Sequence, residues 1–276
     1  MGLRINTNVA SLSAQRNLSK ASSALFRNFE HLSTGRRIAR ASDDAAGLAI
    51  STRLNAQVRS LNQAARNAND GISLVQTAEG SLDEVSNVLV RARELAVQAG
   101  NETLSGNDRD ALQAEFSALI QQVDQIASST NFNGINLLNT SGNVVTLQIG
   151  AGTTTGTDTI DVTLASVLSS DIGIDTLDIG STGDHNAAID AIDAALDTVS
   201  SQRSDLGAVQ NTLTGTISAV ENRVENLSAA HSRIIDVDVA SETAELTKNN
   251  ILQQAALAVL AQANQQPQSA LSLLRG

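Results

Sequence analysis

The chain has 276 residues and contains no cysteine, tryptophan or tyrosine, with only four phenylalanines and one proline. The absence of cysteine excludes a disulfide framework and thiolate chemistry. So few aromatic side chains leave Ala, Leu, Val and Ile to fill the core, which favours thin layers such as helix bundles and coiled coils. No segment approaches 18 uninterrupted apolar residues, so we expect no membrane span. The start, MGLRINTNVA, lacks the regions of a secretory signal peptide, and we expect any export to use another route.

Charge is distributed unevenly along the chain, whose formal net charge is −11. Residues 1–40 carry seven basic residues against one acidic residue, and residues 241–276 are neutral. The middle is therefore strongly acidic, with no Lys or Arg between Arg109 and Arg203. An acidic middle without aromatic stacking platforms argues against nucleic acid as a partner. The basic residues near the start alternate with apolar ones in a helical pattern, which is not typical of a nucleic-acid-binding arm.

Apolar residues recur at steps of three and four over most of the chain, the spacing of amphipathic helices. This spacing predicts helices over residues 1–40 after a short extended start, and then over 45–99, 108–129, 186–235 and 239–264, the last bounded by Pro267. The sequence Ser42-Asp43-Asp44 suits a helix start, because hydroxyl and carboxylate oxygens accept hydrogen bonds from the free N–H groups there. A metal or acid–base role for the two acids is the alternative.

Two β-branched segments, Val144–Ile149 and Thr159–Leu164, predict a β-hairpin joined by a Gly/Thr-rich loop. Residues 165–185 are acidic and irregular. The order of elements is nearly palindromic, because an amphipathic end and a long helix lie on each side of the β-containing middle. We therefore expect a mainly α fold, a long antiparallel coiled-coil rod with a small β-hairpin region and paired N- and C-terminal helices.

Motifs for catalysis and for cofactor binding are missing. The chain has no nucleotide-binding, nucleophile-elbow or HExxH motif, and no EF-hand spacing. The histidines, His31, His185 and His231, lie far apart without ligand spacing. The sequence GAGTTTG lacks a following lysine, so it predicts a flexible turn and not a phosphate loop. We expect no catalytic, cofactor-binding or metal-binding site and no enzymatic activity.

The C-terminal stretch ILQQAALAVLAQANQQPQSALSLLRG has one charged residue and a stripe in which Ala, Ser and Gln outnumber large apolar residues. At about 25 cal/mol per Å² of buried apolar area, one such helix pair hardly offsets an ordering cost of about 1–2 kcal/mol per residue. We infer that both ends become ordered when many copies meet, and that head-to-tail contacts that do not close give a helical filament. The candidate assembly residues are Leu246, Leu257, Leu260, Leu271 and Leu274.

Several long motifs occur in a fixed order. The N-terminal half contains INTNVASLSAQRNL, HLSTGRRIARASDDAAGLAISTRL and LVRARELAVQAGNETL, followed by LQAEF and TNFNGINLL. The C-terminal half contains RSDLGAVQN, SRIIDVD and the final ILQQAALAVLAQANQQPQSALSLLRG. In these motifs the chain closely resembles bacterial flagellin over essentially its whole length. The resemblance implies a structural subunit that self-assembles into the flagellar filament for motility, exported through the flagellum's own secretion apparatus and located outside the cell.

The resemblance also implies a domain scheme and partners. Residues 1–44 and 236–276 correspond to the inner terminal coiled coil, and residues 45–235 to a helical rod with a β-hairpin. Residues 140–185 occupy the place of the large variable outer domains, so the chain resembles a short flagellin. The implied partners are further copies of the chain, an export chaperone that binds the C-terminal helix, and the filament cap and hook-junction proteins.

One receptor surface follows from the same resemblance. In flagellins detected by Toll-like receptor 5, an Arg and a Leu on the long helix and a Glu on the next helix form the recognition surface, and the matching residues are Arg91, Leu95 and Glu115. Val90 stands where the familiar pattern has glutamine. The alternative is that these residues serve subunit packing in the filament.

Three other classes remain as alternatives to a filament subunit. A hook–filament junction protein has flagellin-like ends, but the RARELAVQ segment and the C-terminal match favour flagellin. A coiled-coil adhesin or binding module would not need its ends for self-association. A flagellin with an inserted catalytic domain has no room for one here.

Overall fold

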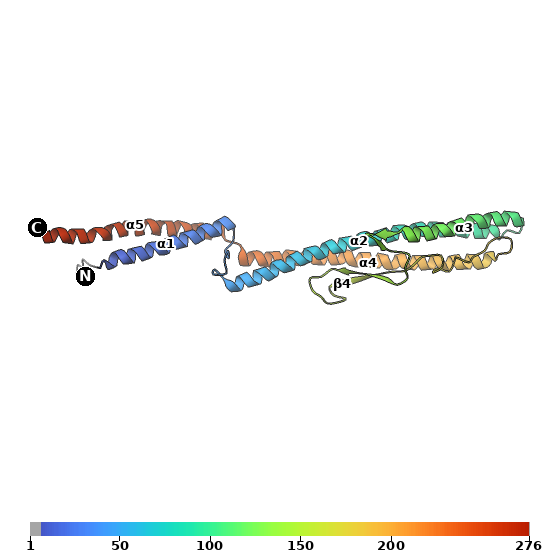
Figure 1. The fold of residues 1–276 in the computed structure, drawn as a ribbon, viewed down its shortest axis with the longest axis horizontal. Helices are drawn as coiled ribbons and strands as arrows, with labels where there is room; N and C mark the ends of the chain where they lie inside the picture. Colours follow the sequence, from blue (N-terminus) through green and yellow to red (C-terminus); the bar gives the residue numbers. More distant parts are fainter. Residues whose placement is uncertain (1–6, 276) are drawn as a thin grey trace. The chain divides into compact units, whose positions relative to one another are not determined.

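The computed structural model describes the backbone of residues 7–275 and the side chains up to Gln265. Most of this part is helical (Figure 1), and the mainly α fold predicted from the sequence is confirmed. The helices are α1 Val9–Thr34, α2 Ala45–Ala99, α3 Gly106–Ser129, α4 His185–Ile235 and α5 Val239–Arg275. The strands are β1 Asn131–Phe132, β2 Ile135–Asn136, β3 Asn143–Gln148 and β4 Thr159–Leu164.

The chain forms two compact units. The terminal unit combines the chain up to Ala56 with the chain from Asn226 onward, and the middle unit contains residues 57–225. Helices α2 and α4 each contribute residues to both units. The three-part domain scheme that follows from the family resemblance stays a prediction.

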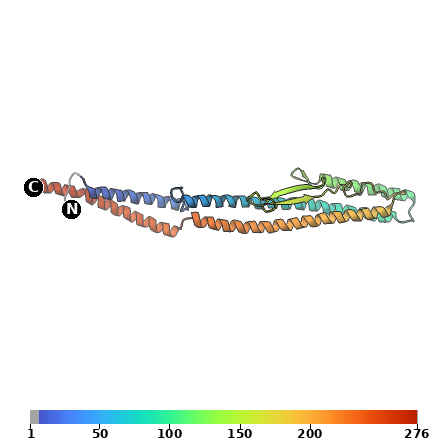
Figure 2. The same ribbon diagram turned by 90° about the horizontal axis from the view of Figure 1, so that it is seen from below.

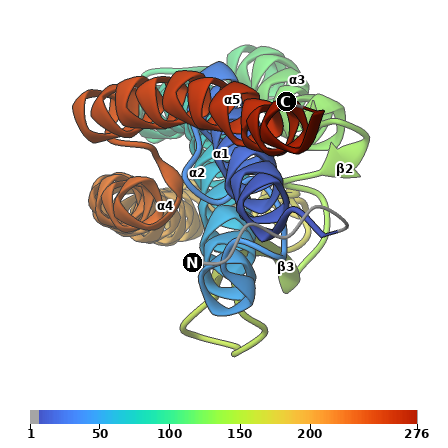
Figure 3. The ribbon, with the colours of Figure 1, turned by 90° about the vertical axis from the view of Figure 1, so that its left-hand side faces the viewer.

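Helices α1 and α5 lie side by side in the terminal unit (Figures 1 and 2), as Figure 3 also shows from a third direction. Their contacts run from Asn8 with Ala263 to His31 with Glu242, so the two helices are antiparallel. Helix α1 begins at its N-cap Asn8, whose side chain accepts a hydrogen bond from the Ser11 N–H, and it ends at Gly35. The predicted pairing of the N- and C-terminal helices is confirmed.

The connection from α1 to α2 is tied to the connection from α4 to α5. Gly35 takes a φ of +69°, a conformation that glycine adopts without strain. The Arg37 N–H donates to the Ile235 carbonyl at 2.7 Å, and the Val237 N–H donates to the Gly35 carbonyl at 3.1 Å. Asp44 then accepts a hydrogen bond from the Gly47 N–H, which confirms its predicted place at the start of α2.

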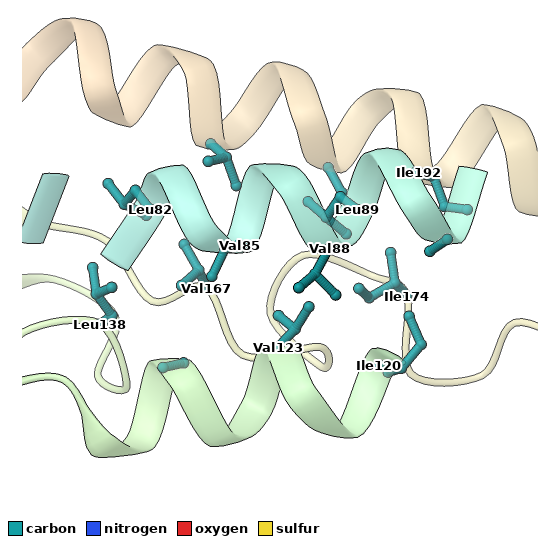
Figure 4. Close-up of a cluster of buried hydrophobic side chains, with 14 of the residues drawn as sticks. Leu82, Val85, Val88, Leu89, Ile120, Val123, Leu138, Val167, Ile174 and Ile192 are labelled. Carbon is teal, nitrogen blue, oxygen red and sulfur yellow. The ribbon is translucent and has the colours of Figure 1, made fainter. Parts of the chain in front are cut away.

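The core of the middle unit lies where α2, α3 and α4 meet an irregular segment. Helix α2 contributes Leu82, Val85 and Leu89, all fully buried, and the labelled side chains of α3 and α4 face them in Figure 4. The four-and-three spacing read from the sequence therefore marks the buried stripe of α2. Phe116 of α3 is 1% exposed and is among the largest fully buried side chains.

The predicted hairpin is confirmed as β3 paired antiparallel with β4, with Asn143 opposite Leu164 and Gln148 opposite Thr159. The shorter antiparallel pair of β1 with β2 was not predicted from the sequence. Its turn is Asn133-Gly134, where both residues have positive φ. Asn-Gly is the sequence preferred in such two-residue hairpin turns, so the signal was present.

The irregular segment between β4 and α4 is packed tightly against α3. Val167 and Ile174 are fully buried, and Asp124 of α3 accepts hydrogen bonds from both the N–H and the hydroxyl of Ser169. Gln113 of α3 likewise accepts a hydrogen bond from the Ile179 N–H at 2.8 Å. Side chains of α3 thus satisfy backbone groups that regular structure would otherwise pair.

The last helix continues past Pro267, so the predicted boundary before this residue is wrong. In an α-helix the Ala263 carbonyl would accept a hydrogen bond from the N–H of residue 267, which a proline lacks. The side-chain amide of Asn8 donates to this carbonyl at 2.7 Å. Pro267 therefore costs α5 one internal hydrogen bond, and α1 supplies a replacement.

Asn8 should stabilise both helices of the terminal unit, and two substitutions separate its two roles. Asn8→Ala removes the helix cap and the amide donor, and we expect it to lower the local free energy of unfolding by about 1–2 kcal/mol. Asn8→Asp keeps a capping oxygen but replaces the amide donor with a carboxylate oxygen that repels the Ala263 carbonyl, so its cost reports the contact with α5. Native-state hydrogen exchange of the α1 amides, measured on assembled chains in which both ends are expected to be ordered, gives both values.

The control repeats both Asn8 substitutions in a chain that also carries Pro267→Ala, in which residue 267 regains an N–H. The cost of Asn8→Asp should then fall, because the Ala263 carbonyl has a partner within its own helix. An equal cost in both backgrounds would contradict the role assigned to Asn8.

Candidate assembly and recognition surfaces

Polar side chains form a series of hydrogen bonds along the contact between α1 and α5. The Ser11 hydroxyl donates to Asn264 at 2.8 Å, and the Gln253 amide donates to the Ser22 hydroxyl at 3.0 Å. Asn28, which is buried, accepts from the Asn249 amide at 2.8 Å and donates to Glu242 at 2.6 Å. We call this series, together with the bond from Asn8 to Ala263, the polar ladder.

Apolar burial between α1 and α5 is small. Among the side chains described, up to Gln265, the buried apolar residues of the two helices are Ala14, Ala21, Leu25 and Ala263. In the same part of the chain the large apolar side chains that stay exposed, each by between 49% and 75%, are Val9, Leu12, Phe26, Phe29, Val239, Ile251, Leu252, Leu257 and Val259. Surfaces of this kind mark interaction sites, because a monomer rarely leaves so many large apolar groups in water.

The predicted assembly leucines differ in how far they are exposed to solvent. Leu257 is 50% exposed, whereas Leu246 and Leu260 are half-buried. Leu271 and Leu274 lie beyond the residues whose side chains are described. A role for all five in assembly stays a prediction.

Phe26 and Phe29 are exposed residues that are not among the predicted assembly residues. Phe29 follows Leu25 at a step of four, which places both toward one helix face, yet Leu25 is 7% exposed and Phe29 is 58% exposed. Four residues turn a helix by about 400°, so Phe29 is rotated by about 40° from Leu25. The signal available in the sequence was that two of its four aromatic residues stand close together on the basic N-terminal helix.

At one end of the polar ladder, His31 lies between two carboxylates. Its Nδ1 is 3.1 Å from Glu242 Oε1, and its Nε2 is 3.9 Å from Asp43 Oδ2. Asp43 also accepts hydrogen bonds from the Arg40 and Ala39 N–H groups, and the first of these is the main reason that the pKa of its carboxyl is lowered. Asp43 thus holds the connection before α2 in a turn, which is a structural role.

The described residues lack two other kinds of site. Within residues 7–275, no helix is both long and apolar enough to cross a membrane. Within the described side chains, no three residues among His, Cys, Asp and Glu come together with the geometry of a metal site.

Arg91 of α2 joins two carboxylates at the surface of the middle unit. Its guanidinium is 2.9 Å from Glu94 on the same helix and 2.9 Å from Glu115 on α3, and all three side chains are roughly half exposed. The hydrogen bond to Glu94, followed by that to Glu115, holds the pKa of the Arg91 guanidinium above its usual value. The structure therefore brings together two of the three predicted recognition residues.

The third predicted recognition residue, Leu95, is 1% exposed and belongs to the core of the middle unit. Exposed apolar side chains on the same stretch of α2 are Val90, at 47%, and Val97, at 52%. In this structure Leu95 can support the surface from beneath, while Arg91 and Glu115 present charged groups to solvent. A receptor role for the three residues stays a prediction.

Two ion pairs cross between α2 and α4. Arg93 donates to both carboxylate oxygens of Asp193, at 2.6 and 3.0 Å, and Arg203 lies 3.0 Å from Asp83. The hydrogen bond from Arg93 lowers the pKa of the Asp193 carboxyl. Because residue numbers rise on one helix as they fall on the other, the pairs also show that α2 and α4 are antiparallel here.

Comparison with known protein families gives matches in both halves of the chain. The family profile described as "Bacterial flagellin N-terminal helical region" matches residues 5–143, and the profile described as "Bacterial flagellin C-terminal helical region" matches residues 189–274. A flagellin from Halalkalibacterium halodurans is 48% identical over 271 residues, which cover 98% of this chain and 99% of that protein. A flagellin from Bacillus subtilis is 46% identical over 308 residues, which cover 99% of this chain and 100% of that protein.

Solved structures give two further matches. The crystal structure of Bacillus cereus flagellin matches with a TM-score of 0.50 and 30% identity, covering 60% of this chain and 94% of that chain. The structure of a putative flagellar hook-associated protein from Vibrio parahaemolyticus matches with a TM-score of 0.58 and 16% identity, covering 70% of this chain and 100% of that chain. At 16% identity the second match shows a shared fold alone.

Replacing Asp193 with Asn should destabilise the middle unit at neutral pH and reduce its sensitivity to acid. The folded pKa of Asp193 is lower than the unfolded value of about 3.9, so its stabilising contribution is complete above that value and is lost as the pH falls through the folded pKa. Chemical denaturation between about pH 7 and pH 3 should therefore show the stability difference narrowing as the pH falls.

The control is Asp197→Asn on the same helix, because Asp197 forms no ion pair within the described part of the chain. Its effect should be small across the pH range. If the difference in the free energy of unfolding between Asp193→Asn and the unchanged chain stayed constant as the pH fell, the stabilising role of the Arg93–Asp193 ion pair would be contradicted.

Proposed function

Because the chain belongs to the bacterial flagellin family, we propose that it builds the flagellar filament through the exposed apolar surfaces of its two end helices, α1 and α5. Flagellins are structural subunits that polymerise into the extracellular filament used for motility, and family membership makes this chain a structural protein of that kind.

The observation that carries the proposal is the exposure of large apolar side chains on a helix pair held together by polar groups. Phe26 is 75% exposed and Ile251 is 61% exposed, on the two helices that form the terminal unit. Burying such side chains against further copies releases about 25 cal/mol per Å² of apolar area. The polar ladder fixes how α1 and α5 are aligned and leaves this area available for association.

The domain scheme of the family gives each unit a place in the filament. We propose that residues 1–44 and 236–276 form the inner coiled coil, and that residues 45–235 form the surrounding helical shell. Residues 140–185 supply only the hairpin region where other flagellins carry outer domains. Support comes from the pairing of α1 with α5 and from the well-packed core of the middle unit.

The same exposed surfaces favour the partners expected of a subunit that must be exported before assembly. We propose that an export chaperone covers α5, on which Leu252 and Val259 are exposed, until neighbouring subunits replace it. Filament cap and hook-junction proteins would contact subunits at the two ends of the filament. These partners rest on the family resemblance together with the exposed face of α5.

For a host receptor, we propose that Toll-like receptor 5 recognises the monomer at Arg91 and Glu115. Support comes from their 2.9 Å ion pair and their partial exposure on neighbouring helices. Charged groups that are fixed in direction by a partner are well suited to recognition, because less side-chain entropy is lost on binding. Leu95 would act indirectly, by packing beneath them.

Two other functions remain to be separated from this one. A hook–filament junction protein shares the fold, as the match to the hook-associated protein indicates, and a coiled-coil adhesin would also be helical. Neither is expected to grow long filaments from a seed. Self-association of an adhesin would also survive the loss of both ends.

Seeded polymerisation followed by electron microscopy tests the filament function. Fragments of filament should grow into long filaments when monomer is added, and chains trimmed of residues 1–40 and 241–276 should add nothing, because α1 and α5 are then lost. Helix content of the trimmed chain is the control, since the middle unit should remain folded. Growth from the trimmed chain would overturn the proposal, and short, non-growing assemblies of the full chain would favour the junction protein.

Receptor recognition is tested by dose–response curves of monomer on reporter cells that express the receptor. Arg91→Ala and Glu115→Ala should each weaken signalling by about tenfold, as central interface residues do. The double variant Arg91→Glu, Glu115→Arg keeps an ion pair but reverses its charges. Its signalling should therefore be as weak as that of the alanine variants. Arg203→Ala, which breaks a comparable ion pair on another face, is the control, and curves that match the unchanged chain for all variants would contradict the proposal.

A further inference from the structure

The sequence contains one Asn-Gly pair, Asn133-Gly134, and this pair forms the turn of the β1–β2 hairpin. Both residues are exposed to solvent, and their φ angles are +50° and +81°. A side chain added at Gly134 would meet nothing within 4 Å, so the turn needs glycine for its positive φ and not for lack of space. The pair is therefore an open turn in contact with water.

An Asn-Gly pair can lose the asparagine amide without an enzyme, because glycine has no side chain to hinder attack by its backbone nitrogen. The nitrogen of Gly134 forms a bond to Cγ of Asn133, the bond from Cγ to Nδ2 breaks, and ammonia leaves with the proton of the attacking nitrogen. Water then opens the resulting cyclic imide at either carbonyl. The product at position 133 is aspartate or isoaspartate, and water is the only co-reactant.

The folded turn keeps the two reacting atoms apart. A two-residue turn with positive φ at both positions is of type I′, in which ψ of the first residue is about +30°. This angle turns the Gly134 nitrogen to about 150° from Cβ of Asn133 around the Cα–C bond, whereas the imide ring needs a torsion near zero. Cyclisation therefore requires the turn to open.

The β1–β2 hairpin is a weak element of the middle unit. Each strand has two residues, and the hairpin forms a sheet of its own. Two-stranded hairpins are marginally stable, and elements of this kind open locally while the rest of a protein stays folded. Leu137, which follows the hairpin, is fully buried, and its N–H donates to the Thr130 carbonyl at 3.1 Å. Opening can thus be confined to the hairpin itself.

We propose that Asn133 is a site of spontaneous deamidation controlled by the β1–β2 hairpin, and that it records how long the chain exists with this hairpin open. The proposal goes beyond the filament function and does not depend on it. Isoaspartate adds a CH₂ group to the backbone, and the length of a hairpin loop sets the pairing of its strands. A turn that has formed isoaspartate would therefore stay open.

Ageing the unchanged chain in mildly alkaline buffer, folded or in denaturant, tests the control by the turn. Fragment mass spectrometry locates the change from amide to acid, and an isoaspartate methyltransferase with labelled S-adenosylmethionine measures isoaspartate. Residue 133 should be modified in the denatured chain and at least about tenfold more slowly in the folded chain, because only the open fraction reacts. Equal rates in the two states, or no reaction at residue 133 in the denatured chain, would overturn the proposal.

The matched control is Asn133→Gly. Gly-Gly is also a preferred pair in type I′ turns, so the hairpin should be kept while the reactive amide is removed. This variant should gain no methyl label in the peptide that contains residue 133. Label at the same level as in the unchanged chain would assign the reaction to another residue.

A second variant changes the opening of the hairpin and leaves the reacting pair intact. Phe132 of β1 packs against the core of the middle unit and ties the hairpin to it. Phe132→Ala should raise the rate in the folded chain by about tenfold, since part of this packing is lost, and leave the rate in denaturant unchanged. Phe26→Ala, which removes an exposed ring from α1, is the control and should alter neither rate. A rate for folded Phe132→Ala equal to that of the unchanged chain would contradict the proposal.

Amide hydrogen exchange tests the effect of the product. Folded chains that carry isoaspartate at position 133 should exchange the amides of residues 131–136 faster than unmodified chains, while the core of the middle unit remains protected. Exchange that is the same in both chains would show that the modified turn still closes, and would refute its proposed persistence in the open form.

Discussion

Hydrogen bonds between small polar side chains hold α1 against α5. The apolar character of the terminal unit's exposed surface follows from this. Asn28 is buried at the contact and bonds both Asn249 and Glu242. Such bonds contribute only about 0.5–1.5 kcal/mol each, but a buried partner left unpaired costs more, so they fix the alignment of the helices strongly. Because small residues occupy the contact, most of the large apolar side chains of both helices point elsewhere.

The middle unit uses the opposite arrangement. Its core is filled by fully buried aliphatic side chains from three helices and from the segment between β4 and α4. Gln113 and Asp124 of α3 satisfy the backbone of that segment, which makes close packing of an irregular chain compatible with paired polar groups. One polypeptide therefore contains a unit that is complete in itself and a unit whose apolar surface calls for further copies.

Much of the fold could be predicted from the sequence, because periodicity reports which side of a helix is apolar. The limits of α2 and the β3–β4 hairpin were predicted almost to the residue. Properties set by a distant partner could not be read in this way. Helix α5 continues through Pro267, and the Ala263 carbonyl left without its helical donor accepts a hydrogen bond from Asn8, more than 250 residues earlier in the chain. The exposure of Phe29 and the burial of Leu95 likewise depend on where α5 and α3 lie.

The separation in sequence between the partners of the polar ladder has a kinetic consequence. Asn8 and Ala263 are 255 positions apart, and even His31 and Glu242 are 211 positions apart. Closing a loop of that size is slow relative to local contacts, and no such contact can form until nearly the whole polypeptide has left the ribosome. Separations within the middle unit are smaller, since Arg93 and Asp193 are 100 positions apart and the hairpins need only short loops. During synthesis, a chain with a finished centre and two unjoined arms is therefore the natural intermediate, and it is in this form that partners acting before assembly would meet it.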